Sequence, residues 1–139
     1  MHNFKELKIW TKALDLSVRV YKITAQFPKD DRFGLISQIK RSAVSIPSNI
    51  AEGAGRNSDK EFIYFLSVAN GSAYELQTQL LISNKLNFLK DELLESMLLE
   101  LDEIQKMNYN FQKSLKKNSI TTNDKSKKKE TIEYIKSKL

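Results

Sequence analysis

Apolar side chains recur at helical spacing along almost the whole chain. Two overlapping series repeat every three or four positions in residues 4–26, and another follows in residues 33–54. A third runs through residues 58–86, and a regular heptad leads from Leu94 to Leu115. No segment alternates apolar and polar residues for long enough to predict a strand. The pattern therefore predicts an all-α protein, an antiparallel up-down bundle of four helices.

Short polar segments mark where these helices begin and end. Phe27 precedes a proline, which biases it out of the helical region and ends the first helix. Ser58 and Glu61 have the spacing of a capping box, which predicts that the third helix opens there. Asp91 is placed to cap the fourth helix. Because the chain has only four glycines and two prolines, we expect few turns and long helices.

Pro47 lies inside the second series, although the apolar spacing continues past it to Ile50. A proline in a helix interior lacks one hydrogen-bond donor and crowds the carbonyl four residues earlier, here Ala43, at a cost of about 3 kcal/mol. Nearby serine hydroxyls can donate to a carbonyl freed in this way. We therefore predict a second helix that is kinked at Pro47 but continuous, with the small residues Ala51 and Gly53 allowing close packing after the bend.

The third helix is poor in charge. From Phe62 to Asn84 the only charged residue is Glu75, and apolar side chains point in several directions around the predicted helix. A helix that is apolar on nearly all sides is buried on nearly all sides. A lone four-helix bundle leaves each helix a solvent face, so the surplus predicts that the protein forms a homo-oligomer.

The first helix carries a straight polar row that is mostly basic. Its members are spaced three or four residues apart, and five of the six are cations: Lys5, Lys8, Lys12, Asp15, Arg19 and Lys22. A row of this kind is the electrostatic footprint of a polyanion, so the five cations are candidate contacts to the phosphates of RNA or DNA. Lys40 and Arg56 are candidates to extend this basic row. The alternative is an ordinary solvated helix face.

A second polar set, on the second and third helices, has two interpretations. In the structural one, Arg41, Asn49, Glu52 and Glu75 form a satisfied network at a helix or subunit interface. A lone charge in an apolar helix is costly unless it is paired. We therefore expect Arg41 to pair with Glu75 or Glu52, within the bundle or across a subunit boundary. In the functional interpretation, Arg41 faces a ligand phosphate.

Charge and polarity divide the chain into a helical domain, residues 1–117, and a basic polar tail, residues 118–139. The chain has a net charge of +6 and a pI near 9.4, and the tail contributes six lysines and three acidic residues. Residues 118–129 offer no apolar face, which predicts a mobile linker. Residues 130–139 have the spacing of a short terminal helix. The lysines of residues 125–129 are placed to add phosphate contacts to the basic row.

Side chains for catalysis are missing. The chain has no cysteine, and its single histidine, His2, lies at the terminus. The Gly-rich segment at residues 53–55 follows a helix and lacks the lysine of a phosphate-binding loop. We therefore expect a non-enzymatic protein that needs no metal or cofactor. Since there is no long apolar run and no signal peptide, we also expect it to be cytoplasmic and not to enter a membrane.

The segment around Pro47 also carries a family resemblance, which covers about residues 4–117. Its most specific part is "SIPSNIAEGAGR" at residues 45–56, preceded by Gln38 and Arg41 and followed by Gly71, Ser72 and Glu75. This block resembles the bacterial four-helix bundle family first noticed as open reading frames inside intervening sequences of 23S rRNA genes. Asn70 departs from the pattern, because the family often has a basic residue there.

The resemblance implies an assembly as well as a fold. The family is similar in architecture to the accessory variability protein of diversity-generating retroelements, a basic pentameric bundle that works with a reverse transcriptase and nucleic acid. A pentamer is therefore implied, with RNA, DNA or a protein such as a reverse transcriptase as partner. Our function hypothesis is a non-enzymatic homo-oligomeric bundle, an accessory factor that binds RNA or DNA through phosphate contacts. The alternative is an oligomeric scaffold that binds a protein partner and no nucleic acid.

Overall fold

The computed structural model describes residues 1–29 and 34–138, without the side chains of residues 119–123. All regular structure within this part of the chain is helical, which confirms the predicted all-α class. A short 3-10 helix, η1 (Phe4–Glu6), precedes four α-helices. These are α1 (Lys8–Thr24), α2 (Leu35–Ala54), α3 (Asp59–Lys85) and α4 (Asp91–Lys138). The predicted start of the second helix near residue 33 lies outside the described residues.

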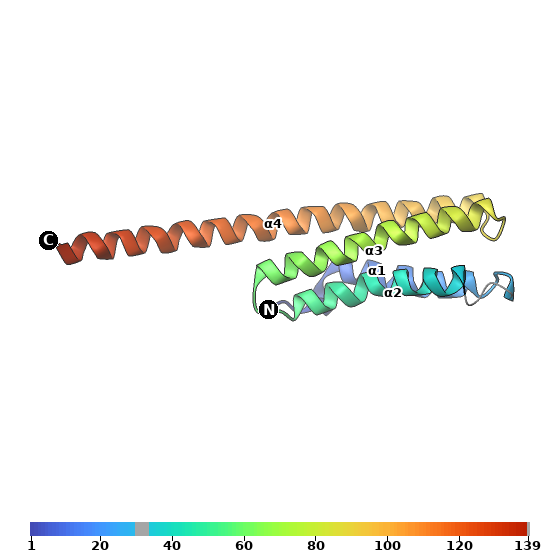
Figure 1. The fold of residues 1–139 in the computed structure, drawn as a ribbon, viewed down its shortest axis with the longest axis horizontal. Coiled ribbons are helices and arrows are strands. Elements are labelled where there is room, and N and C mark those ends of the chain that lie inside the picture. The colour runs from blue at the N-terminus through green and yellow to red at the C-terminus, as the bar shows by residue number, and fades with distance from the viewer. Residues whose placement is uncertain (30–33, 139) are drawn as a thin grey trace.

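The four α-helices lie alongside one another (Figure 1). Their buried side chains form one apolar core. α2 packs between α1 and α3, and α4 packs against both α3 and α1. Each helix contributes large side chains that are at most 1% exposed, among them Leu16, Ile46, Leu66 and Leu101. Full burial of a side chain of this size stabilises the fold by about 1.5–3 kcal/mol. The core therefore extends through all four helices, and Leu115 on α4 is the last buried residue that the structure describes.

α2 runs without interruption through Pro47, which is buried. The predicted continuity is confirmed, and the kink stays a prediction. The carbonyl of Ala43, which proline deprives of its helical donor, has a donor from the neighbouring helix: Ser17 Oγ of α1 lies 2.7 Å from it. The same hydroxyl lies 2.9 Å from the carbonyl oxygen of Ala13. The rescuing serine therefore comes from α1 and not from α2.

The helix ends follow their caps, with one correction. Ser58 is the N-cap of α3 and accepts a hydrogen bond from the backbone N–H of Glu61 at 3.2 Å, as the capping-box spacing predicts. Asp91 is the first residue of α4 and does not cap it. Its carboxylate accepts a hydrogen bond from Asn84 Nδ2 at 2.7 Å, which ties the end of α3 to the start of α4.

The polar tail is not a separate linker and helix. α4 continues as one helix from Asp91 to Lys138, so the predicted break between residues 118 and 129 is absent from the described backbone. The physical reason is that the sequence contains no glycine after Gly71 and no proline after Pro47, and lysine and glutamate favour helix. We call residues 116–138 the α4 overhang. It spans about 35 Å at 1.5 Å per residue and reaches far past the other helices (Figure 1).

Candidate nucleic-acid interface

The two central cations of the basic row face α4, where carboxylates neutralise them. Lys12 Nζ lies 2.8 Å from an oxygen of Glu103. Arg19 forms an ion pair with Glu100, and its other terminal nitrogen donates to Ser96 Oγ at 2.9 Å. These partners lie about 80 or more positions away in the sequence, so a helical wheel of α1 could not reveal them. The middle of the basic row therefore ties α1 to α4.

The remaining members of the basic row do not make a uniform cationic strip. Lys5, Lys8 and Lys22 are exposed and form no ion pair within the described residues. A hollow of about 240 Å³ lies between α1 and α4. Asp15 lines it together with the two paired cations and their two glutamates. Three carboxylates and two cations share this hollow, so its field is mixed in sign and gives little attraction to a polyanion.

Lys40 lies near the start of α2 and Arg56 just beyond its end, so they do not extend the basic row as one surface. Lys40 Nζ sits 4.9 Å from the centre of the Tyr21 ring. Arg56 lies 2.6 Å from a carboxylate oxygen of Glu52, four residues earlier, and also stacks 4.8 Å from the Phe65 ring. Arg56 is therefore already neutralised, whereas Lys40 keeps its charge over an aromatic face.

The predicted polar network is divided into separate contacts. Glu75 is exposed and accepts a hydrogen bond from Ser42 at 3.4 Å. Asn49 donates to the backbone carbonyl of Ser45 at 2.8 Å, and Glu52 pairs with Arg56 as described above.

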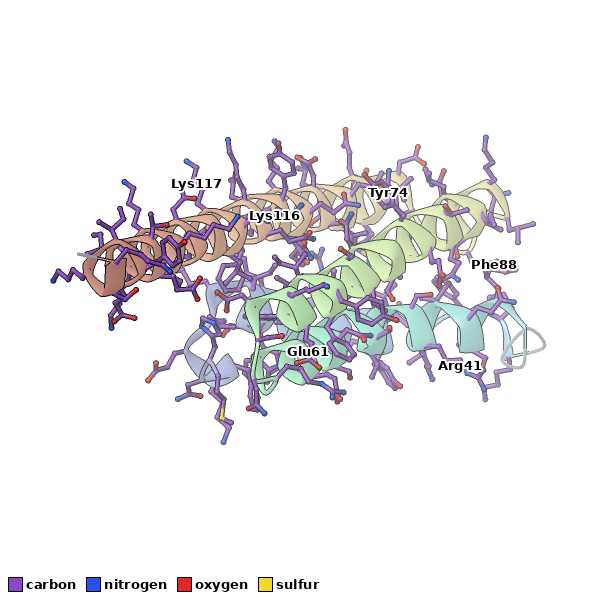
Figure 2. The ribbon with its side chains drawn as sticks, turned by 60° about the vertical axis from the view of Figure 1, so that its left-hand side comes forward. Arg41, Glu61, Tyr74, Phe88, Lys116 and Lys117 are labelled. Carbon is purple, nitrogen blue, oxygen red and sulfur yellow. The ribbon has the colours of Figure 1, made fainter. Side chains whose placement is uncertain are left out.

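Arg41 is exposed on α2, well apart from Lys116 and Lys117 on α4 (Figure 2). It forms no ion pair with any described residue. Within the described chain, Glu75 contacts Ser42 and Glu52 contacts Arg56, and neither is paired with Arg41. Pairing across a subunit boundary stays a prediction.

The net charge of the protein lies at the end of α4. Residues 1–112 carry 14 basic and 14 acidic side chains and are formally neutral. Residues 113–138 carry nine lysines and three acidic residues, which accounts for the whole net charge of +6. Lys113 and Lys116 are exposed and form no ion pair within the described chain. A division of the sequence at residue 117 hides this asymmetry, and a running sum of charge along the chain would have found it.

Neither a metal-ligand cluster nor a membrane-spanning helix is found among the described residues. No cluster of three or more histidine, cysteine, aspartate or glutamate side chains suited to a metal ion occurs among them. None of the helices in this part of the chain is both long and apolar enough to cross a membrane.

Comparisons with known proteins agree with this architecture. A crystal structure of a protein with unknown function from the S23 ribosomal protein family of Bacteroides thetaiotaomicron VPI-5482 has 27% sequence identity and a TM-score of 0.70. That match covers 76% of this chain and 95% of the other. No curated protein matches the chain significantly.

A family model described as "23S rRNA-intervening sequence protein" matches residues 5–110. Neither this description nor that of the crystal structure names a catalytic activity. The match ends just before the lysine-rich end of α4, residues 113–138, which therefore lies outside the matched region. Since the matched region is well over half of the sequence, the chain belongs to the 23S rRNA-intervening sequence protein family.

Proposed function

We propose that this protein is a non-enzymatic accessory factor that binds RNA or DNA through phosphate contacts made by the lysine-rich end of α4. One observation carries the proposal: residues 113–138 hold the whole net charge of +6, on a helix that projects from a formally neutral body. Lysines on such a helix attract phosphates and release their counterions, which favours binding without reference to sequence. The family's link to 23S rRNA genes supports an RNA-related role.

The proposal includes a homo-oligomer of antiparallel four-helix bundles. The outward side of α3 exposes apolar side chains with little charge, among them Tyr64, Val68 and Ile82. Gly71 lies on the same side, and a Cβ added there would meet nothing within 4 Å. A glycine inside a helix costs about 1 kcal/mol relative to alanine, and no contact with a described residue requires Gly71. Close approach of a second copy would explain it. The pentamer and a reverse transcriptase partner stay predictions.

The test is a filter-binding titration of short RNA and DNA across ionic strength, on the parent protein and two matched variants. One variant replaces three lysines of the α4 overhang, Lys127, Lys128 and Lys129, with glutamine. The other replaces Lys5, Lys8 and Lys22, the unpaired members of the basic row, also with glutamine. The slope of log K against log salt is negative, and each lost phosphate contact should make it less negative by about 0.7–0.9. We expect this loss in the overhang variant, with the basic-row variant close to the parent.

Two results would contradict the proposal. If the basic-row variant loses as much binding as the overhang variant, α1 contributes to the interface despite its ion pairs. If the parent shows no salt-sensitive binding near physiological ionic strength, the protein is better described as an oligomeric scaffold for a protein partner.

A further inference from the structure

A polar groove between α3 and α4 lies where the α4 overhang leaves the body. Its volume is about 460 Å³. The side chains that could meet a ligand there are amides, one aromatic ring and two lysines: Asn70, Gln105, Gln112, Tyr109, Lys113 and Lys116. No carboxylate is among the described residues that line it. In this respect it differs from the hollow between α1 and α4, which contains three.

One amide in this groove is committed to the fold. Asn108 is 2% exposed and donates to the carbonyl of Leu66 at 2.8 Å. Its side-chain oxygen accepts a hydrogen bond from Gln112 Nε2 at 2.6 Å, which orients Gln112 along the groove. The Gln112 oxygen in turn accepts from Ser67 Oγ at 3.4 Å. The groove is therefore shaped by a hydrogen-bonded chain of side chains that links α3 and α4.

A second amide has a donor without a partner. Gln105 Nε2 is shielded from solvent and has no hydrogen-bond acceptor among the described protein atoms. Gln105 lines this groove and also the smaller hollow beside it. A shielded donor that lacks an acceptor destabilises the protein, so this amide is a weak point in the packing beneath the groove.

An exposed aromatic ring connects the two hollows. Tyr109 is 68% exposed and lines both the groove and the neighbouring hollow of about 280 Å³. Tyr74 of α3 lines that second hollow, is 58% exposed and lies beside α4 (Figure 2). Exposed tyrosine rings next to lysines are typical of surfaces on which unpaired bases stack while lysines contact the phosphates.

We propose that the groove between α3 and α4 binds single-stranded nucleic acid. Lys113 and Lys116 contact phosphates, and a base stacks on Tyr109. A duplex cannot use this site, because its bases are already stacked and their pairing edges are occupied. The inference rests on the proposed phosphate binding and adds to it a preference for single strands, located at a named site.

The test is fluorescence anisotropy with a labelled single strand and the duplex of the same length, on the parent, Tyr109→Ala and Tyr134→Ala. Tyr134 is the matched control because it is 64% exposed on the same helix but lies outside the groove. We expect the parent to favour the single strand. Tyr109→Ala should weaken single-strand binding by about 5- to 100-fold, with duplex affinity and salt slope unchanged. Tyr134→Ala should leave the preference intact.

Several results would overturn this inference, and they differ from those that overturn the proposed function. If the parent binds the single strand and the duplex with equal affinity, or if Tyr109→Ala binds as the parent does, single-strand binding in the groove is refuted. Phosphate binding by the overhang would then still stand. If the parent binds neither the single strand nor the duplex, both the proposed function and the groove inference are refuted. Light scattering of Tyr109→Ala supplies an independent readout: a lower mass than the parent would make the groove an interface between copies.

Discussion

At the scale of single residues, the contact between Ser17 and Ala43 explains how α2 tolerates a buried proline. Ser17→Ala should leave the Ala43 carbonyl without a donor and lower the free energy of unfolding by about 1–3 kcal/mol. In a Pro47→Ala background the loss should be smaller, because the restored N–H of residue 47 reaches the same carbonyl. Urea unfolding of the two single variants and the double variant measures this coupling.

The control for this double-mutant cycle of Ser17→Ala and Pro47→Ala is Ser83→Ala. Ser83 is fully buried and donates to the carbonyl four residues earlier, at 2.8 Å, but no proline lies in its turn. That carbonyl keeps its own helical donor, so the substitution should cost less than Ser17→Ala. Equal costs for the two serines, or full additivity of Ser17→Ala and Pro47→Ala, would show that Ser17 does not serve the proline.

Replacing each of the two glycines inside helices with alanine should change the stability of the protein in opposite directions. A Cβ at Gly53 would lie 2.7 Å from Phe62 and 2.8 Å from Phe65, so Gly53→Ala should destabilise the protein by about 1–3 kcal/mol. Gly71 has open space, so Gly71→Ala should stabilise the single chain by up to about 1 kcal/mol. Thermal unfolding at low protein concentration compares them. A stabilising Gly53→Ala would contradict the close approach of α2 to α3.

At the scale of elements, the α4 overhang is separable from the core. Removal of residues 119–139 takes away no buried side chain among those that the structure describes, because the last described one on α4 is Leu115. The free energy of unfolding should therefore stay within about 0.5 kcal/mol of the parent. Helical circular dichroism should fall, since the described residues removed are helical. An unchanged helical signal per molecule would favour the mobile linker that the polar composition predicted.

At the scale of the whole molecule, the apolar side of α3 should hold copies of the chain together. Light scattering at micromolar concentration should give several times the chain mass of 16.1 kDa. Val68→Glu should lower that mass, because it places a charge among apolar side chains that we expect to be covered. Thr131→Glu adds the same charge on the overhang and should leave the mass unchanged. A parent that is monomeric at this concentration would rule out the proposed assembly.

The sequence by itself determined the all-α class, the main helices and the Ser58 cap, and only the tertiary structure decided which charges are paired. Periodicity and capping are local, so the all-α class, the Ser58 cap and continuity through Pro47 could be predicted from neighbours within a few positions. The end of α4 could not, because its polar composition suggested a linker while nothing in it breaks a helix. The ion pairs of the basic row could not be predicted from the sequence for a different reason. Lys12 and Arg19 meet Glu103 and Glu100 only after α1 and α4 pack together, and the field of a charged side chain depends on partners in space, whatever their distance along the chain.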